Sequence, residues 1–324
     1  MNSFELISDA NKRYSSQYLG ELANHLPMDL VALERLGASV ERLRTYRDHY
    51  VERLEPVLDS LGMLISEANW QEFLGQNKYH VDYIHYFEKF LATNGLRKTL
   101  EFHLPTLFRG VAGGAFHGLI RLGYALDSNN MEEVSQALGY WAISFLDLGI
   151  EQVNCGTKNS KEIFSELSTE FLGFRPEAPN IARRMELIAR LARFRQICAG
   201  LNVEIATYEN IAPLVLELFA QTNDFTALHA VTATHAYRLV SKYHSASIEI
   251  FIALSAAYVS IRAPKIQVLE PVSIDVHWNS LKERAVRSND DHVPKIVYTC
   301  FQEYCVHSDS RYFLAACTYV EKFC

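Results

Sequence analysis

The sequence predicts an all-α fold, organised as a single large multi-helix domain over residues 1–324. Apolar residues recur at three- and four-residue intervals along most of the chain, as they do on one face of a helix. Glycine, proline and serine stand at the ends of these segments. The alternation typical of a strand is confined to residues 268–276, where Pro271 favours an extended linker, and no Gly/Ser/Pro-rich stretch separates two domains.

The N-terminal half contains several helices with recognisable ends. Pro27 suits the first turn of a helix over residues 27–36, and Gly37 suits its C-terminus. Ser39 can cap a second helix, which Pro56 interrupts. Further helices are expected over residues 80–93, over 96–108 with a break near Pro105, and after the glycines at 110, 113 and 114.

The C-terminal half continues in the same way. The expected helices cover residues 131–147, 161–171, 182–194, 211–221, 225–243, 248–261, 278–287, 293–305 and 311–323. The apolar segment 248–261 contains Glu249 and is too short to cross a bilayer, so it predicts a buried helix. The turn-rich stretches 153–159 and 173–180 are the expected loosest connections.

Composition and charge narrow the possible partners. A net charge of −7 and a pI near 6.0, without a dense basic run, argue against nucleic acid and anionic membranes. The first residues lack the basic and apolar regions of a signal peptide, which predicts a cytoplasmic protein. Six cysteines without a CxxC pair predict reduced thiols. We therefore expect a small-molecule or protein ligand.

Residues 290–295 resemble the start of a helix and place two chemically versatile side chains one turn apart. Asp290 or Asp291 can cap the free backbone donors, and Pro294 is tolerated in the first turn. His292 and Lys295 then share one face, where the positive helix end favours their neutral forms. A neutral imidazole can bind a metal, and a neutral amine can add carbon dioxide to form a carbamate ligand. The alternative is an ordinary solvated helix start.

Twelve histidines are present, and their neighbours distinguish them. His25 precedes a helix, and His117 lies among small residues that allow close approach. His229 and His235 share one helix, but six residues turn them roughly 120° apart, so only His229 is expected as a metal ligand. We predict surface positions for the histidines at 49, 80, 244, 277 and 307, and half-buried positions for those at 85 and 103.

Four segments resemble the questin oxidase-like family, in the same order along the chain. They are Asn24-His25-Leu26-Pro27-Met28 with Leu36-Gly37-Ala38, Arg109-Gly110 with the stretch from Gly114 to Ala125, Leu228-His229-Ala230-Val231-Thr232, and Asp291-His292-Val293-Pro294-Lys295. The most specific is the His-x-x-[Ile/Leu]-x-x-Gly-Tyr-Ala block that begins at His117.

The resemblance implies an all-helical oxygenase that oxidises polyketide-type aromatic quinones and cleaves a ring by Baeyer–Villiger-like or dioxygenase chemistry. Its partners would be a small aromatic substrate and dioxygen. No flavin module is implied, and the sequence has no G-x-G-x-x-G motif after a strand. The family is similar in having a non-haem iron centre with a carboxylated lysine. Matching positions give the ligands His25, His117, His229, His292 and Lys295.

Elementary chemistry agrees with such a centre and suggests further residues. Imidazole suits iron, and an anionic carbamate on Lys295 would balance the charge of a buried divalent cation. The candidate substrate-binding and catalytic residues are Arg109 and Arg121 for an anionic group, Tyr124 and Thr232 for a carbonyl, and His235. Surface ion pairs and helix packing are the alternative roles for these residues. A zinc or manganese hydrolase and a non-catalytic helical interaction protein remain the alternative functions.

Overall fold

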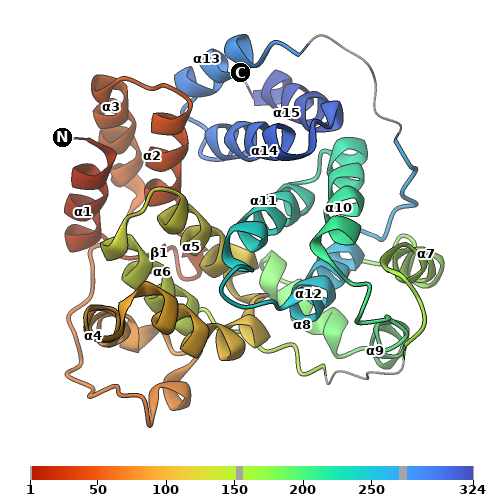
Figure 1. Cartoon of the computed structure of the whole chain (residues 1–324), viewed down its shortest axis with the longest axis horizontal. Coiled ribbons are helices and arrows are strands. Elements are labelled where there is room, and N and C mark those ends of the chain that lie inside the picture. The colour runs from red at the N-terminus through yellow and green to blue at the C-terminus, as the bar shows by residue number, and fades with distance from the viewer. Residues whose placement is uncertain (1, 151–155, 270–275, 324) are drawn as a thin grey trace.

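The computed structural model describes residues 2–150, 156–269 and 276–323. Fifteen α-helices make up most of this part of the chain, which confirms the all-α class (Figure 1). The strands described are a two-residue antiparallel pair, β1 (Gln17–Tyr18) and β2 (Leu22–Ala23), joined by a tight turn. Among these residues, no helix combines the length and apolar character needed to cross a bilayer.

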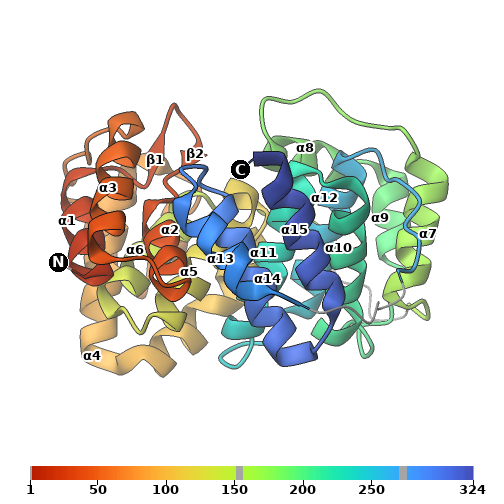
Figure 2. The same ribbon diagram turned by 90° about the horizontal axis from the view of Figure 1, so that it is seen from above.

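The first part of the chain forms one side of the molecule, coloured red to olive in Figures 1 and 2. Its α-helices are α1 (Ser3–Arg13), α2 (Leu26–Arg35), α3 (Val40–Tyr50), α4 (His80–Leu107), α5 (His117–Asp127) and α6 (Met131–Ile143). Short 3-10 helices connect them: η1 (Val51–Arg53), η2 (Trp70–Phe73), η3 (Asn77–Tyr79), η4 (Phe108–Gly110) and η5 (Gly113–Phe116).

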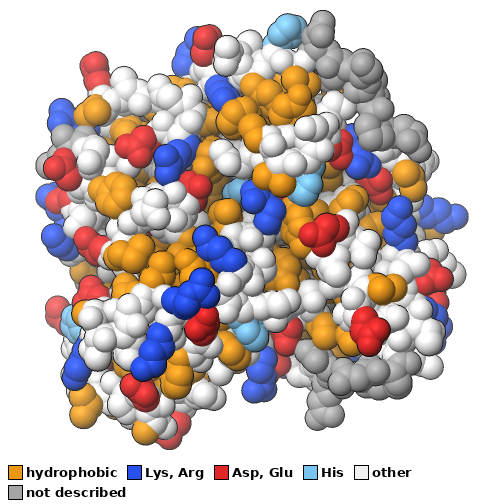
Figure 3. Space-filling view, in the orientation of Figure 1, with side chains coloured by type: hydrophobic (Ala, Val, Ile, Leu, Met, Phe, Trp, Pro, Cys, Tyr) orange, Lys and Arg blue, Asp and Glu red, His pale blue; other side chains and the backbone are white. Residues whose placement is uncertain are grey.

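The later helices form the opposite side and the centre. They are α7 (Ser160–Phe171), α8 (Ile181–Ala189), α9 (Ala192–Cys198), α10 (Tyr208–Thr222), α11 (Phe225–Val240), α12 (Ser247–Ser260), α13 (Trp278–Arg287), α14 (Val293–His307) and α15 (Ser310–Phe323). Helix α14 packs on α2 from the first part and on α11, and α11 packs on α5. One hydrophobic core joins both sides, from Leu6 in α1 to Val320 in α15. The outer face in Figure 3 mixes acidic, basic and hydrophobic side chains.

Close backbone contacts bring the central helices together. A Cβ atom on Gly123 of α5 would lie 2.8 Å from the Cβ of Ala236, so glycine is needed where α5 meets α11. A Cβ atom on Gly118 would lie 2.5 Å from the ring of Trp141, which lets α6 approach the opposite flank of α5. The two glycines let α5 pack closely between α6 and α11, and this packing positions His117, the first residue of α5.

Several element boundaries differ from those the sequence predicts. Helix α1 was not expected, although Asn2 and Glu5 form a capping box at its start. The helix expected over residues 131–147 ends at Ile143. The predicted helices 80–93 and 96–108 are present as α4, which is interrupted at Gly95 with φ of 75°, whereas Pro105 lies within its last turns. The expected extended segment 268–276 and the turn-rich segment 153–159 lie partly outside the described residues.

Candidate metal centre

Four imidazoles meet in the interior, and each comes from the beginning of a helix. His25 and His292 are the N-cap residues of α2 and α14, His117 is the first residue of α5, and His229 lies in the second turn of α11. Each of these residues is at most 7% exposed. Because helix N-termini carry partial positive charge, their convergence favours neutral imidazoles and any anion that binds beside them.

The rings pack directly against one another. The His25 ring stacks on His117 with centroids 4.6 Å apart and an interplanar angle of 12°. It meets the His292 ring edge-on at 4.9 Å. His229 lies 4.9 Å from His117 and 5.4 Å from His292, so the four rings form a closed group.

Every Nδ1 atom in this group has a hydrogen-bond partner. Nδ1 of His117 lies 2.5 Å from the carbonyl oxygen of Gly114, and Nδ1 of His229 lies 2.7 Å from that of Phe225. A carbonyl oxygen only accepts, so the proton of each neutral ring is on Nδ1, and the lone pair is on Nε2. Hydrogen bonding of one ring nitrogen while the other faces a common centre is the usual arrangement of metal-binding histidines.

A single carboxylate, Asp291, serves the other two rings. Its Oδ2 accepts from Nδ1 of His25 at 2.7 Å, and its Oδ1 lies 3.2 Å from Nδ1 of His292. Burial alone would raise the pKa of Asp291, but the two imidazoles more than offset this effect and hold the pKa well below its ordinary range. The neighbouring Asp290 has a different role, because it accepts the backbone N–H groups of His292 and Val293 and caps α14.

Burial keeps the four imidazoles uncharged. Desolvation, with repulsion from Lys295, lowers the pKa of His25 to about 3. Desolvation also lowers the pKa of His117 and of His229 well below the ordinary value, with smaller contributions from neighbouring imidazoles. The pKa of His292 is lowered by burial and then by Lys295. The rings therefore need not lose a proton before binding a metal at neutral pH.

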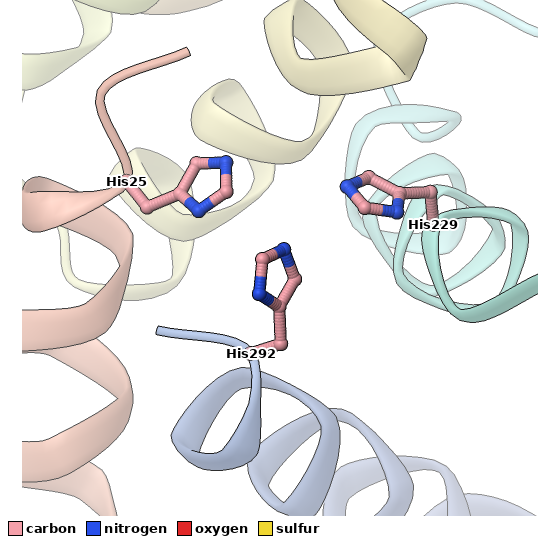
Figure 4. A group of neighbouring side chains, drawn as sticks. All are labelled: His25, His229 and His292. Atoms are coloured by element: carbon pink, nitrogen blue, oxygen red, sulfur yellow. The ribbon is translucent and has the colours of Figure 1, made fainter. Parts of the chain in front are cut away.

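The donor set fits a metal ion. Ring nitrogens of His25, His229 and His292 lie within 4.8 Å of one another and face a common space (Figure 4). Two ligands of one ion are at most about 4.2 Å apart when each bond is about 2.1 Å, so only a small contraction is required. Nε2 of His292 is buried without a hydrogen-bond partner among the described residues. Such a nitrogen is unfavourable unless something binds it, and a metal ion would.

Lys295 is buried beside this group and is only 3% exposed. Its Nζ lies 3.9 Å from Oδ1 of Asp29, which has no hydrogen-bond partner among the described residues, while Oδ2 of Asp29 accepts from the hydroxyl of Tyr46 at 2.9 Å. Burial lowers the pKa of Lys295 and raises the pKa of Asp29 well above its ordinary value. Burial thus works against charge on both side chains.

A cavity of about 410 Å³ opens beside the imidazoles, within the roughly 300–1,000 Å³ typical of small-molecule sites. The turn between β1 and β2 forms one wall, and α8 forms another. Glu21 in that turn accepts from Arg183 at 2.9 Å and from Asn180 at 2.7 Å, which ties the two walls together. Ile181 and Phe225 add apolar surface. The cavity therefore combines a mixed polar and apolar lining with a metal-competent end.

The two arginines expected to face an anionic substrate group lie elsewhere. Arg109 is 62% exposed and pairs with Asp147 at 2.7 Å, in a depression that contains no histidine. Arg121 is buried and donates to Glu133 at 2.5 Å and to Asn11 at 3.1 Å. Both guanidinium groups have carboxylate partners, and neither lines the cavity.

The other three expected residues also make contacts outside the cavity. Tyr124 donates to the backbone carbonyl of Lys295 at 3.4 Å, and Thr232 donates to the carbonyl of His229 at 3.1 Å. Both support residues of the histidine group without lining the cavity. His235 lies apart, with its Nδ1 2.5 Å from Glu303. The separation of His229 and His235 along α11 agrees with their expected angular difference.

Three of the other histidines differ from their expected burial. His80 was expected at the surface but is buried, with Nε2 3.0 Å from the hydroxyl of Ser16, and desolvation lowers its pKa to about 3. His103 is fully buried, and its two nitrogens contact the Thr99 carbonyl and the Tyr86 hydroxyl. His85 is exposed. Polar sequence neighbours do not reveal contacts made with distant segments.

Several residues around the site were not anticipated in these roles. Asp29 lies one turn after His25, and a single carboxylate inside the apolar stretch Leu26–Leu33 is a signal that the sequence contained. Asp291 was expected only as a possible cap. Glu21 and Arg53 line the cavity from segments without a distinctive pattern, so nothing local indicated them.

Comparison with known proteins agrees with the resemblance noted from the sequence. A Baeyer-Villiger oxidase, AgnL3, from Paecilomyces divaricatus is 27% identical over 160 residues, which cover 45% of this chain and 35% of that protein. The chain thus spans about a third of the length of this relative. The family model described as Questin oxidase-like matches residues 22–300, a span that contains all four histidines and Lys295. This chain belongs to the questin oxidase-like family.

Proposed function

We propose that this protein is an oxygenase that uses a bound metal, non-haem iron, to oxidise or cleave a ring of an aromatic polyketide or quinone. The observation that carries the proposal is the group of four neutral, buried imidazoles whose Nδ1 atoms are all engaged. His25, His117, His229 and His292 would hold the ion through Nε2. The cavity beside them has both apolar and polar lining residues, which suits an aromatic molecule that carries polar groups.

Iron is favoured by the chemistry of the donors and by the relatives. Imidazole binds iron, copper, nickel and zinc, but the family name and the relative named as a Baeyer-Villiger oxidase both point to oxidation. When bound, iron would let triplet dioxygen react with a closed-shell aromatic compound through one-electron steps, while the net electrons come from the substrate or from a reductant. The protein's own contribution is to fix the imidazoles through Asp291 and backbone carbonyls and to enclose the substrate in a cavity with both apolar and polar side chains.

Lys295 is proposed to carry a carbamate that also binds the ion. Four neutral imidazoles bring no charge to a divalent cation, and the Asp291 carboxylate acts on it only through two of the rings, so one anionic ligand would reduce the cost of burying the ion. Burial favours the neutral amine from which a carbamate forms. The competing arrangement is a plain ion pair between a Lys295 ammonium and Asp29, which are 3.9 Å apart.

Substitution of Lys295 separates these arrangements. A carbamate ligand predicts that Lys295→Ala loses metal, that a short carboxylate partly restores it, and that bicarbonate raises the occupancy of the parent. Lys295→Arg should not be restored, because its bulk and permanent charge remain. Asp29→Asn is the matched variant, because it removes the carboxylate near Lys295 and leaves the amine in place. If Lys295 binds the metal as a carbamate, this variant should retain metal unless Asp29 helps to position the carbamate. Undiminished metal affinity in Lys295→Ala would disprove the carbamate.

The oxygenase is tested on protein purified without a histidine tag. Elemental analysis should find about one iron per chain, and turnover of a hydroxylated anthraquinone should consume dioxygen without added flavin. Labelled dioxygen distinguishes the reaction types, because insertion of one atom with reduction of the other to water requires two electrons from a reductant, whereas insertion of both atoms does not. Full turnover without oxygen, as expected of a hydrolase, would overturn the proposal.

A further inference from the structure

Four charged side chains line the cavity beside the histidines: Glu21, Arg53, Arg183 and Asp291. Three of them have partners at hydrogen-bond distance. Glu21 pairs with Arg183 at 2.9 Å, and Asp291 accepts from two imidazoles. Arg53 differs, because its closest carboxylate among the described residues, that of Asp291, is 4.0 Å away. The guanidinium of Arg53 is thus the cavity cation without a close carboxylate partner.

Neighbouring aromatic residues hold Arg53 in place. Its guanidinium lies over the ring of Tyr50, 4.5 Å from the centroid, and Tyr18 lines the same cavity. The Tyr50 hydroxyl in turn accepts the backbone N–H of His25 at 2.9 Å. Stacking of this kind fixes the plane of a guanidinium and leaves its edge available to another group. Arg53 is therefore oriented by the same tyrosine that contacts the His25 backbone.

We propose that Arg53 binds an ionised oxygen of the substrate, a phenolate or a carboxylate, and so selects and orients an anionic aromatic molecule beside the histidines. The inference rests on the proposed function for the aromatic nature of the substrate. A guanidinium has five N–H donors and can bind an oxyanion through two of them, so a planar anion would be fixed in direction as well as in place. The apolar residues of the cavity would then contact the rings.

Arg53 is better placed to bind an anionic substrate group than Arg109 or Arg121, the two arginines that the sequence suggested. Arg109 and Arg121 are paired with Asp147 and Glu133 at short distances and lie outside the cavity. Arg53 has 35% of its side chain exposed, so an incoming ligand can reach it. Oδ2 of Asp291 lies 4.0 Å from the guanidinium of Arg53 and 2.7 Å from Nδ1 of His25. An oxyanion held by Arg53 would therefore lie close to the proposed metal ligands.

A pair of probes that differ in one ionisable group tests the proposal. The hydroxyl of 2-hydroxyanthraquinone is conjugated with a quinone carbonyl, makes no internal hydrogen bond and ionises readily, whereas 2-methoxyanthraquinone has the same rings without an acidic proton. Dissociation constants of both are measured by absorbance titration without oxygen, at a pH where the free hydroxyl is ionised. Because turnover is not needed, the measurement stands even if the proposed oxygenase activity fails.

Arg53→Gln should weaken binding of the hydroxy compound by about 10- to 100-fold, the usual effect of a hydrogen bond to a charged group, and leave the methoxy compound within twofold. Arg53→Lys should recover part of the loss, since the charge remains without the planar fork. Arg193→Gln, which removes an exposed arginine that pairs with Glu170 and does not line the cavity, is the control. Metal content is measured in every sample.

The outcomes are distinct. Equal weakening of both probes, unchanged binding of both, or a parent protein that binds the two equally or binds neither, would overturn the role of Arg53. Selective loss of the hydroxy compound supports it. Absence of metal or of oxygen consumption in the parent would instead refute the proposed function, whatever the Arg53 variants do.

Discussion

Two buried histidines on one helix should respond to substitution in opposite ways. His229 and His235 both lie in α11, and each is 3% exposed. His229 contacts the other imidazoles, whereas His235 contacts Glu303 in a separate cluster. Their replacement therefore compares the proposed metal site with an equally buried position that has a structural partner only.

The structure gives rough magnitudes for both substitutions. Loss of a group that merely orients a ligand lowers metal affinity by about 10–100-fold, so His229→Ala, which removes the ligand, should exceed about 100-fold. His235→Ala should instead destabilise the fold, because Glu303 is only 2% exposed and loses a partner. Breaking a buried pair costs about 3–5 kcal/mol, and we expect the lower end because Arg238 remains 2.9 Å from Glu303.

Metal content and stability are measured separately on untagged protein. Elemental analysis gives the metal content, and urea unfolding of the metal-free protein gives the free energy of unfolding. His235→Gln retains an amide that can donate to Glu303 and serves if the alanine variant does not fold. Equal metal loss in the two positions, or full retention in His229→Ala, would refute the assignment of His229 as a ligand.

Three further results are expected. Asp291→Asn should lower metal affinity by about 10–100-fold in a chelator competition, since one oxygen that accepts from an imidazole is replaced by an amide donor; unchanged affinity would contradict this. The pKa of His80 is about 3 in the fold, so the unfolded chain binds a proton first as pH falls below about 6.5, and this residue alone should cost metal-free protein up to about 1.4 kcal/mol of stability per pH unit down to about pH 3. The buried histidines of the site add to the same loss, so His80→Asn should lower the slope of stability against pH by about that amount in urea titrations, and parallel profiles would count against it. Gly113→Ala should destabilise the protein by about 3 kcal/mol or more, because its Cβ would lie 1.7 Å from the Ser144 carbonyl oxygen. Gly20→Ala has open space around the new Cβ and should cost only about 1 kcal/mol, and thermal or urea unfolding measures both variants.

Much of the fold follows from local sequence signals. Ser39 caps α3 as predicted, and its hydroxyl accepts the N–H of Arg42. Asp290 caps the start of α14, also as predicted. Such signals depend on residues a few positions apart, so they can be read without the tertiary structure. The missed helix α1 had an equally local signal in Asn2 and Glu5, so that omission was avoidable.

The candidate site was only partly accessible from local patterns. Each of the four histidines lies near a helix start, which the sequence indicates, but their convergence depends on how α2, α5, α11 and α14 pack. The family resemblance supplied that grouping in advance. Partners of single side chains were less predictable: Arg121 meets Glu133 and Asn11, and the latter is 110 residues away along the chain. Arg53 was missed for the same reason, because its position over the ring of Tyr50 and in the cavity wall beside Tyr18 depends on the tertiary structure.

The hydrogen bond between His25 and Asp291 joins residues 266 positions apart in the chain. During synthesis, His25 is therefore added long before Asp291, His292 and Lys295. Until residue 291 has been made, the ring of His25 lacks the carboxylate that orients it. The group of four histidines can form only after that point, and a chain cut before Asp291 could fold many of its helices while lacking the part of the site that α14 contributes.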